Sequence, residues 1–472
     1  MDRAVLYEAL RSHDSRFDGK FFVGVRSTGI YCRPVCRVRL PKEENCTFFP
    51  TAAEAERAGY RPCLKCRPEL APGNSLLEAS GDLAASAAAM IEASCGNDER
   101  LAELAHRLGC TDRHLRRVFE AEFHVTPLQY RQTCRLLLAK NLLTDTDLSV
   151  LDVAMASGFG SLRRFNAVFE QAYHLTPTGL RRQYRAAGRP VGRITVEIGY
   201  RPPYEWERML EFLAARAIRG VETVRDGAYL RTVRIRDASG WLRVENRPEH
   251  SALAVTLSES LLRVLPQTLS RVRHMFDTAS DPQQIAEALA DMRRLDARLP
   301  VCGLRIPGCF DPFETSARAV LGQQITVSAA TTLAGRISEA YGRRVETGIE
   351  GLTHTFPTAE EVLEMGGTVE ERFGALGVIA ARSRTISELA KLFASDRPER
   401  ALHPETLLAI RGVGPWTASY ISMRALGNPD AFLAGDLGVK KALAPRTAKE
   451  MEALAEAWRP WRSYAVLNLW TL

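Results

Sequence analysis

The spacing of apolar residues divides the chain into a mixed region and a long helical region. Residues 193–300 alternate stretches of helical period with short β-like runs at 193–198, 229–235 and 251–257. Residues 305–472 are almost wholly helical by period. Two segments rich in Pro and Gly, 69–74 and 186–192, interrupt the pattern. These breaks, with the change of pattern near residue 300, predict four domains, at residues 1–75, 80–185, 193–300 and 301–472.

An internal repeat lies in residues 80–185. Leu101–Gly109 matches Leu151–Gly158, and Val118 aligns with Val168, 50 residues later. Each copy predicts an apolar helix, a turn that contains Gly, and a second helix rich in arginine. This is the pattern of a helix-turn-helix, whose second helix enters the DNA major groove. One such pair is weak evidence, but two copies in register are much stronger. The candidate DNA contacts are the arginines at exposed positions of the second helices: Arg113, Arg116, Arg117, Arg163 and Arg164.

The composition fits a globular protein that binds nucleic acid. Apolar residues make up 46% and charged residues 25%, and the chain lacks an apolar run of the ~18 residues that a membrane span needs. The N-terminus does not resemble a signal peptide, so we expect a cytoplasmic, nucleoid-associated protein with no membrane partner. The net charge of +7 is modest, but one stretch concentrates arginines. A solvated helix face with a linker explains that stretch as well as a phosphate-binding stripe does. It contains a single acid, Glu170, beside Arg163, Arg164, Arg181, Arg182, Arg185, Arg189 and Arg193.

Two close pairs of cysteines predict a metal site. Cys32 and Cys36 are separated by three residues, and Cys63 and Cys66 by two. Two clips of this kind supply four soft thiolates to a tetrahedral ion, which fits Zn²⁺ best. Cys46 stands alone between them and is expected to be a small buried residue. From spacing alone, a purely structural zinc site is the ordinary interpretation.

The residues around these cysteines carry a family resemblance. The segments 17–39 and 59–68 are similar to the N-terminal domain of the Ada family of adaptive-response proteins, over nearly all of residues 1–70. The resemblance implies that Cys32 is both a zinc ligand and the nucleophile that takes a methyl group from a methylated DNA phosphate. A thiolate on a Zn²⁺ with four such ligands stays ionised and nucleophilic at neutral pH. The basic residues close to the site are candidates to hold flanking phosphates: Arg33, Arg37, Arg39 and Lys65.

Methyl transfer would also provide a signal. Forming a thioether removes one negative charge from a surface that faces DNA, so repulsion weakens and binding tightens. The repeat in residues 80–185 resembles the paired helix-turn-helix of the AraC family of transcription regulators. That resemblance implies promoter DNA as a partner and RNA polymerase as a second one.

A different DNA-binding pattern lies near the C-terminus. Gly412 and Gly414 belong to a predicted helix-hairpin-helix turn, where backbone N–H groups approach a phosphate. Asp436 follows Gly412 by 24 residues (436 − 412), and a hairpin followed by an acid is typical of helix-hairpin-helix DNA glycosylases. Trp416 stands where a Lys would permit Schiff-base lyase chemistry. The sequence also has no four-cysteine iron–sulfur motif near this end, so we expect a monofunctional glycosylase.

Residues 198–472 resemble the AlkA family of 3-methyladenine DNA glycosylases. The matching stretches include 203–206, 209–217, 304–309, 319–323 and 458–464. The resemblance implies that Asp436 is the catalytic acid and that Trp416, Tyr420 and Trp470 line the base pocket. An alkylated purine is cationic, so it stacks on aromatic faces and leaves without a general acid. Two positions depart from the family.

The first departure is Gly435, which stands where the family often has a second Asp. The second is Gln324, which replaces a bulkier apolar side chain in the loop expected to wedge into the duplex. Both bear on substrate range and efficiency more than on reaction type.

Together these patterns predict a multidomain α+β protein. We expect a small zinc-bound α/β domain, an all-α double helix-turn-helix domain, an α+β subdomain, and an all-α helix-hairpin-helix domain. The predicted function is release of alkylated purines from double-stranded DNA, joined to a methyl-accepting transcriptional activator with one Zn²⁺ that acts as a monomer. No Pro-Cys-His-Arg motif occurs, so the O6-alkylguanine methyltransferase site that often accompanies the Ada family is absent.

Two alternatives remain open. One is a transcription regulator whose glycosylase-like part binds DNA without catalysis. The other is a DNA-binding protein whose zinc site is structural and accepts no methyl group.

Overall fold

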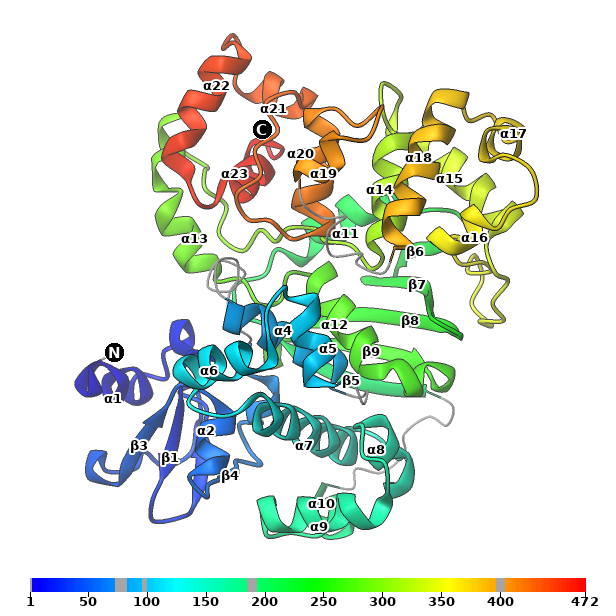
Figure 1. The fold of residues 1–472 in the computed structure, drawn as a ribbon. Helices are drawn as coiled ribbons and strands as arrows, with labels where there is room; N and C mark the ends of the chain where they lie inside the picture. Colours follow the sequence, from blue (N-terminus) through cyan, green and yellow to red (C-terminus); the bar gives the residue numbers. More distant parts are fainter. Residues whose placement is uncertain (1, 73–82, 96–99, 185–192, 396–403) are drawn as a thin grey trace. The chain divides into compact units, whose positions relative to one another are not determined.

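The computed structural model describes residues 2–72, 83–95, 100–184, 193–395 and 404–472 (Figure 1). Its contacts divide the chain into two units. The first comprises residues 1–202, 247–270 and 278–280, and the second comprises 203–246, 271–277 and 281–472. In the described residues, no helix is long and apolar enough to cross a membrane.

The first unit begins with a small sheet that carries the paired cysteines. Its strand order is β3-β1-β2-β4, with β1 antiparallel to β2 and β3, and β2 parallel to β4. Cys46 is fully buried in β3, as predicted. The elements are α1 (Arg3–Arg11), β1 (Phe22–Val25), β2 (Ile30–Cys32), β3 (Cys46–Phe49), α2 (Ala52–Arg57) and β4 (Arg61–Pro62), with short 3-10 helices η1 (Ser15–Phe17), η2 (Glu43–Asn45) and η3 (Pro68–Leu70).

Seven helices follow in the described residues, and they repeat in structure as the sequence predicts. Thr111 and Ser161 cap the second helix of each copy, and both helices end at a histidine with left-handed backbone, His124 and His174. The helices are α4 (Leu83–Ser94), α5 (Leu101–Arg107), α6 (Asp112–Phe123), α7 (Pro127–Asp145), α8 (Val150–Ala156), α9 (Leu162–Tyr173) and α10 (Pro177–Tyr184). The long helix α7 joins the first copy to the second.

The arginine-rich stretch is divided among several elements. Arg163 and Arg164 are exposed on α9, and Arg193 begins strand β5 (Arg193–Gly199). Arg185 and Arg189 lie outside the described residues. In the first unit, β5 pairs with antiparallel β9 (Ala252–Ser258). The short helices η4 (Pro248–His250) and η5 (Glu259–Val264) flank β9, and α12 (Leu265–Met275) crosses the unit boundary along the sequence.

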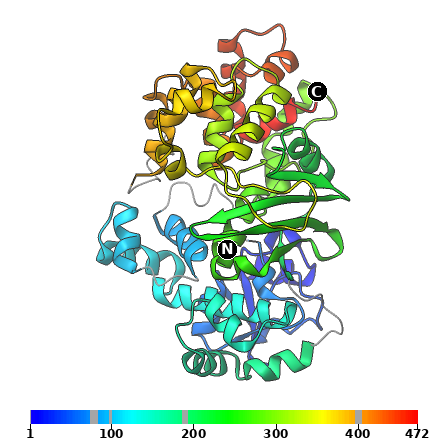
Figure 2. The ribbon, with the colours of Figure 1, turned by 90° about the vertical axis from the view of Figure 1, so that its right-hand side faces the viewer.

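The second unit contains three antiparallel strands, where sequence analysis expected one. Strands β7 and β8 pair along eight positions, from Ala228–Glu245 to Ile235–Ala238, and appear as long neighbouring arrows in Figure 2. Gly240, Ser239 and Asn246 lower the strand propensity of β8, and pairing with β7 overrides it. The missed strands are β6 (Glu222–Arg225) and β8 (Ala238–Arg247), beside β7 (Ala228–Ile235).

The remainder of the second unit is helical, as predicted for 305–472. Its core gathers side chains from α14, α15, α18 and α20, among them Val320, Ile337, Leu389 and Ile421. The helices are α11 (Trp206–Ala214), α13 (Pro282–Ala288), η6 (Ala290–Arg294), α14 (Pro312–Leu321), α15 (Val327–Tyr341), α16 (Ala359–Leu363), α17 (Val369–Gly374), α18 (Ala380–Phe393), α19 (Pro404–Leu408), α20 (Pro415–Ala425), α21 (Leu437–Ala442), α22 (Ala448–Ala455), η8 (Glu456–Trp458) and α23 (Arg462–Leu469). All six tryptophans of the chain lie in this unit: Trp206, Trp241, Trp416, Trp458, Trp461 and Trp470.

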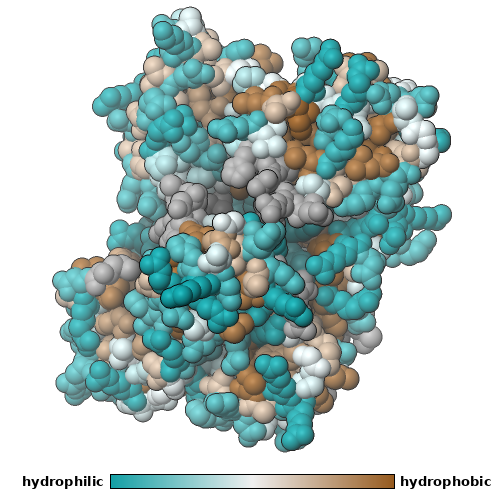
Figure 3. All heavy atoms as spheres, in the orientation of Figure 1, coloured by the Kyte–Doolittle hydropathy of each residue, from teal (hydrophilic) through white to brown (hydrophobic). Residues whose placement is uncertain are grey.

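The exposed apolar side chains are scattered. On the face drawn in Figure 3, brown apolar groups are interspersed with teal hydrophilic side chains. Exposed apolar residues occur on several helices, including Leu128, Leu151, Met155 and Leu437. Single apolar side chains of this kind are normal on a protein surface.

Candidate functional site

The structure brings the four predicted zinc ligands together in the first unit. One sulfur from each of Cys32, Cys36, Cys63 and Cys66 lies within 4.8 Å of the others. Cys32 ends β2, and a turn closed by the Cys36 N–H on the carbonyl of Arg33 brings Cys36 back beside it. Cys63 follows β4, and its N–H donates to the carbonyl of Tyr31 over 2.9 Å. Parallel pairing of β2 with β4 therefore places the two cysteine pairs at one sheet end.

The donor set fits a soft divalent cation. Cys32, Cys36 and Cys63 are buried and Cys66 is half-buried. Hydrogen bonds with the other three thiols hold the pKa of Cys66 far above its usual range, and hydrogen bonding with Cys32 holds the pKa of Cys63 far below it. The four thiols are too crowded to ionise together without a cation, and Zn²⁺ satisfies four thiolates in tetrahedral geometry.

Arg33 is inside this site rather than on its surface. Its guanidinium pairs with Asp18 through two contacts, one of 2.8 Å from Nε, and donates to the carbonyl of Cys66 over 3.1 Å. Its backbone N–H also lies 3.4 Å from the sulfur of Cys66. This corrects the expectation that Arg33 holds a flanking phosphate, because a buried guanidinium already paired with a carboxylate is unavailable to DNA. Arg33 instead ties the two cysteine loops together.

The other predicted basic residues have the exposure that DNA contact requires. Arg37, Arg39 and Lys65 are exposed near the cluster, and Arg113, Arg163 and Arg164 are exposed on the two second helices. On α6, Arg116 pairs with Asp112 over 3.0 Å, and Arg117 contacts His114. A surface pair of this kind is weak and can exchange for a phosphate.

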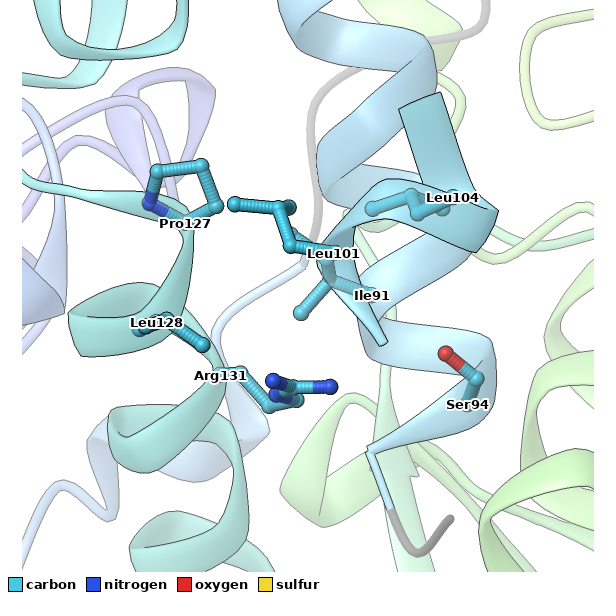
Figure 4. A pocket seen from close by; sticks show the side chains of 7 residues that line it. All are labelled: Ile91, Ser94, Leu101, Leu104, Pro127, Leu128 and Arg131. Carbon is cyan, nitrogen blue, oxygen red and sulfur yellow. The ribbon is translucent and has the colours of Figure 1, made fainter. Parts of the chain in front are cut away.

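A small hollow in the first helix-turn-helix copy is a packing feature. Ile91, Leu101, Leu104, Pro127 and Leu128 line it with apolar atoms, together with Ser94 and Arg131 (Figure 4). These side chains come from α4, α5 and α7, and none of the predicted site residues is among them.

The helix-hairpin-helix turn is present in the second unit. It joins α19 to α20, and Gly414 is the N-cap residue of α20. Gly412 has a φ of +96°, and a Cβ there would lie 2.2 Å from Oγ1 of Thr385. A Cβ at Gly414 would meet open space, so the packing of the described residues does not require glycine there. A glycine in such a place leaves room for a ligand to approach the backbone.

Asp436 is held at both carboxylate oxygens. It is the N-cap residue of α21, and Oδ1 accepts from the N–H groups of Gly438 and Val439 over 2.9 and 3.2 Å. The indole N–H of Trp470 donates to Oδ1 over 2.9 Å, and that of Trp416 donates to Oδ2 over 3.2 Å. These donors fix the direction of the carboxylate.

The three predicted pocket aromatics gather around this carboxylate. Trp416 and Tyr420 stack with ring centroids 5.1 Å apart and planes 16° apart. Trp470 stacks on Phe212 of α11 at 6.0 Å and 14°. Aromatic faces with an anionic group beside them suit a flat, cationic ligand.

The two positions that depart from the AlkA pattern are both exposed. Gln324 lies between α14 and α15 with a φ of +56°. Its neighbour Gln323 ties this loop to the hairpin, donating to the carbonyl of Gly412 over 2.9 Å and to Oγ1 of Thr417 over 3.0 Å. At Gly435, an added Cβ would make ordinary contact with Trp416 at 3.6 Å, so the packing of the described residues does not require glycine there.

Comparison with known proteins identifies the family. The chain is 39% identical to the "Probable bifunctional transcriptional activator/DNA repair enzyme AlkA" of Mycobacterium tuberculosis, over 98% of this chain and 95% of that protein. The chain belongs to this family of AlkA-type bifunctional proteins.

Domain families account for most of this AlkA-type chain. Residues 5–69 match the metal binding domain of Ada and residues 104–183 a helix-turn-helix domain. Residues 195–311 match the AlkA N-terminal domain, and residues 317–462 the HhH-GPD superfamily of base excision DNA repair proteins. These matches confirm the predicted fusion and fold class, and with the cysteine cluster they support a zinc site.

Two further relatives each match one half of the AlkA-type chain. "DNA-3-methyladenine glycosylase 2" of Escherichia coli is 34% identical over 58% of this chain and 95% of its own length. "Bifunctional transcriptional activator/DNA repair enzyme AdaA" of Bacillus subtilis is 30% identical over 37% of this chain and 81% of its own length.

Three residues that contact these aromatic side chains were not predicted from the sequence. Phe212 stacks on Trp470, and the guanidinium of Arg216 lies 3.7 Å from the centre of the Phe212 ring. Arg424 donates to the hydroxyl of Tyr420 over 2.8 Å and to the carbonyls of Pro307 and Gly308. A signal existed in the helical spacing, because Trp416, Tyr420 and Arg424 recur every four residues, as do Phe212 and Arg216.

These arginines change the electrostatics of the pocket. Burial alone would raise the pKa of Tyr420, but Arg424 and Arg216 bring it below its usual value. Burial lowers the pKa of Arg216. The phenol oxygen of Tyr420 therefore accepts a hydrogen bond from the Arg424 guanidinium, whereas Asp436 supplies negative charge beside Trp416.

Proposed function

We propose that the second unit is a monofunctional DNA glycosylase that releases alkylated purines of the 3-methyladenine type. The observation that carries this proposal is the Asp436 carboxylate, fixed by two indole N–H groups beside stacked aromatics. The similarity to an E. coli protein named DNA-3-methyladenine glycosylase 2 supports the substrate class.

The geometry accounts for the chemistry. An extruded cationic purine stacks on Trp416 and Tyr420, and its positive charge makes it a good leaving group. As the glycosidic bond breaks, the ionised Asp436 stabilises the oxocarbenium-like sugar and orients the water that attacks it. Trp416 occupies the place of a Schiff-base lysine, so the strand is not cleaved by that route.

The DNA is held by backbone as well as side chains. In this proposal the hairpin N–H groups after Gly412 and Gly414 bind a phosphate at the start of α20. Gln324 fills the space that the extruded nucleotide leaves, and the Gln323 contacts hold its loop against the hairpin.

A base-release assay on alkylated duplex DNA tests the proposal. Wild type is expected to release methylated purines and Asp436→Asn to lose nearly all activity. Asp296→Asn is a matched control, because it makes the same change at a half-buried carboxylate that accepts from the side chain and the backbone N–H of Arg298. No release by wild type would favour the non-catalytic regulator.

We infer a second function for the first unit, transfer of a methyl group from a DNA methylphosphotriester to Cys32. The Cys32 thiolate forms an S–C bond, the C–O bond of the ester breaks, and the phosphate oxygen keeps the electron pair. One Zn²⁺, held by Cys32, Cys36, Cys63 and Cys66, would keep the thiolate ionised. Exposed Arg37, Arg39 and Lys65 would hold the neighbouring phosphates.

The product is a stable thioether, so each molecule reacts once. Loss of one negative charge then strengthens promoter binding by α6 and α9, and the activated monomer engages RNA polymerase. Mass spectrometry after exposure to methylphosphotriester DNA tests the transfer: one methyl group is expected on Cys32, none in Cys32→Ser, and normal transfer in Cys110→Ser, a cysteine outside the cluster. Normal transfer by Cys32→Ser would overturn the assignment.

A further inference from the structure

We propose that the segments beside the four cysteines pack on helix α7, so that a change of structure at the cluster displaces the second helix-turn-helix copy. The segments that follow or precede the cysteines dock on one face of α7 and on the buried side of α9. This inference rests on the proposed methyl transfer and adds a route of regulation to it.

One face of α7 is built to receive these segments. Thr133, Leu137, Lys140 and Asn141 recur at the spacing of a helix face, and Asp145 continues it at the C-terminal end. Thr133, Lys140 and Asn141 are buried although they are polar. Leu137 packs against the apolar cluster of the small sheet that contains Phe22 and Tyr31.

The first connection starts next to Cys32. The hydroxyl of Tyr31 donates to Oε1 of Glu56 over 3.1 Å, and Oγ1 of Thr133 donates to Oε2 over 2.8 Å. Glu56 lies in the last turn of helix α2 in the cysteine module, whereas Thr133 belongs to α7. Two hydrogen bonds on one buried carboxylate therefore lead from the residue beside the methyl acceptor to α7.

The second connection starts next to Cys66. Arg67 takes a left-handed backbone, with a φ of +53°, and donates to Asp145 over 2.6 Å and to Asn141 over 3.0 Å. Glu69 lies two residues on and pairs with Lys140 over 2.6 Å. The side chains of Lys140 and Glu69 are only 1% and 3% exposed. Glu69 also pairs with Arg67 over 3.1 Å, so displacing Glu69 takes a counter-ion from both buried Lys140 and Arg67, and this network specifies one arrangement.

The third connection starts next to Cys63. Leu64 lines a small hollow together with Phe169 and Tyr173 of α9 and Leu180 of α10. Phe169 and Tyr173 lie on the buried side of α9, and Arg163 and Arg164 are exposed on its other side. A displacement of the Cys63–Cys66 loop therefore acts on the helix that carries the predicted DNA contacts.

The three connections give the cluster a path to DNA-binding residues that does not depend on charge alone. Methylation turns the Cys32 thiolate into a thioether, a weaker ligand, and the four-cysteine arrangement must readjust. Tyr31, Leu64 and Arg67 adjoin the cysteines, so their contacts to α7 and α9 readjust with them. In Figure 1, α7 leads from this region towards α8–α10.

The test uses the full chain, methylated by a short duplex that carries one methylphosphotriester and then separated from it at high salt. The main variant is Lys140→Met with Glu69→Gln, which removes both charges and leaves neither partner alone. Thr133→Val is a milder second variant should the first fail to fold. Arg11→Met with Glu8→Gln is the matched control, because it removes an exposed ion pair on α1 of the same module.

The readouts are amide hydrogen exchange in α9 and affinity for the unmodified duplex, with methylation of Cys32 verified by mass. Methylation is expected to change exchange in α9 and raise affinity in wild type and control, and both effects should fall to less than half in the two variants. Full wild-type effects in both variants would overturn the inference. If wild-type Cys32 accepts no methyl group, the proposed methyl transfer is wrong, independently of this inference. Zinc removal then replaces methylation as the perturbation. Unchanged amide exchange in α9 after zinc removal would overturn the proposed coupling between the cluster and α9.

Discussion

The cysteine cluster and the Asp436 site are proposed to react with alkylated DNA in different ways. The cluster takes its donors from one short stretch, Cys32 to Cys66, and the supports around it are ion pairs and hydrogen bonds from other segments. The Asp436 site takes its side chains from Phe212 to Trp470, and three of them, Trp416, Tyr420 and Arg424, lie on α20, a helix of the apolar core. The cluster is proposed to be consumed, whereas the pocket is proposed to return unchanged. A site that reacts once can sit on loops that move, but a site that turns over benefits from rigid helices.

Removing zinc separates the two sites most sharply. Structural zinc contributes about 10–16 kcal/mol in small zinc modules, so chelation is expected to abolish methyl acceptance and to expose amides in residues 2–72. Base release by the second unit should be unchanged. Amide exchange and the base-release assay, run on one chelated sample, measure both effects. A parallel loss of base release would show that the two sites are not independent.

The stability of the first unit is expected to depend on pH through Glu56. Burial raises the pKa of Glu56 to about 7, against the partial opposition of Thr133, Tyr31 and Tyr173. A carboxyl whose pKa is higher in the folded state stabilises the fold at pH values below its pKa in the unfolded state. That stability is lost as pH rises through its pKa in the folded state. The wild-type free energy of unfolding of the first unit should therefore fall between about pH 4.5 and 7, by at most about 3 kcal/mol.

Glu56→Gln should remove most of this fall. The measurement is the urea midpoint for pulse proteolysis of α2 and α7, at several pH values. Equal pH dependence in wild type and Glu56→Gln would assign it to other groups.

The indole hydrogen bonds to Asp436 are expected to affect the rate of base release rather than the stability of the fold. Trp470→Phe removes the 2.9 Å indole hydrogen bond to Asp436 and keeps an aromatic face. A hydrogen bond to a charged group contributes about 1.5–3 kcal/mol, so base release should slow by about 10- to 100-fold. Trp416→Phe removes a 3.2 Å bond and should have a smaller effect. Single-turnover assays give the rates, with Trp241→Phe as a control outside the pocket.

The smallest effect concerns the wedge. Gln324→Ala should slow release from a fully paired duplex by about fivefold, or about 1 kcal/mol, because extrusion of a paired base costs a few kcal/mol. Release from a mismatched site should be nearly unaffected, since less unpairing is needed there. An equal loss on both substrates would assign Gln324 a role other than filling the stack.

The sequence predicted the parts of the molecule that depend on local spacing. The paired cysteines, the repeated helix-turn-helix and the hairpin at Gly412 all follow from residues close together in the chain. Strand β8 was missed because its preference for pairing comes from β7 rather than from its own composition. Arg33 was misplaced for a similar reason, since its partner Asp18 is distant and only the fold shows that the pair is buried. The spacing of Phe212 and Arg424 gave a local signal, but their contacts with Trp470 and with the Pro307 carbonyl arise only from the fold.

The distribution of tryptophan makes indole fluorescence a reporter of the second unit alone. Every indole belongs to the second unit, so emission excited selectively from indole follows the repair half and ignores the regulatory half. Trp416 and Trp470 stand beside the Asp436 carboxylate, so a purine stacking there is expected to quench part of that emission. Binding of a damaged base can thus be followed in real time by indole fluorescence of the unlabelled full-length chain, with no indole signal from the cysteine module.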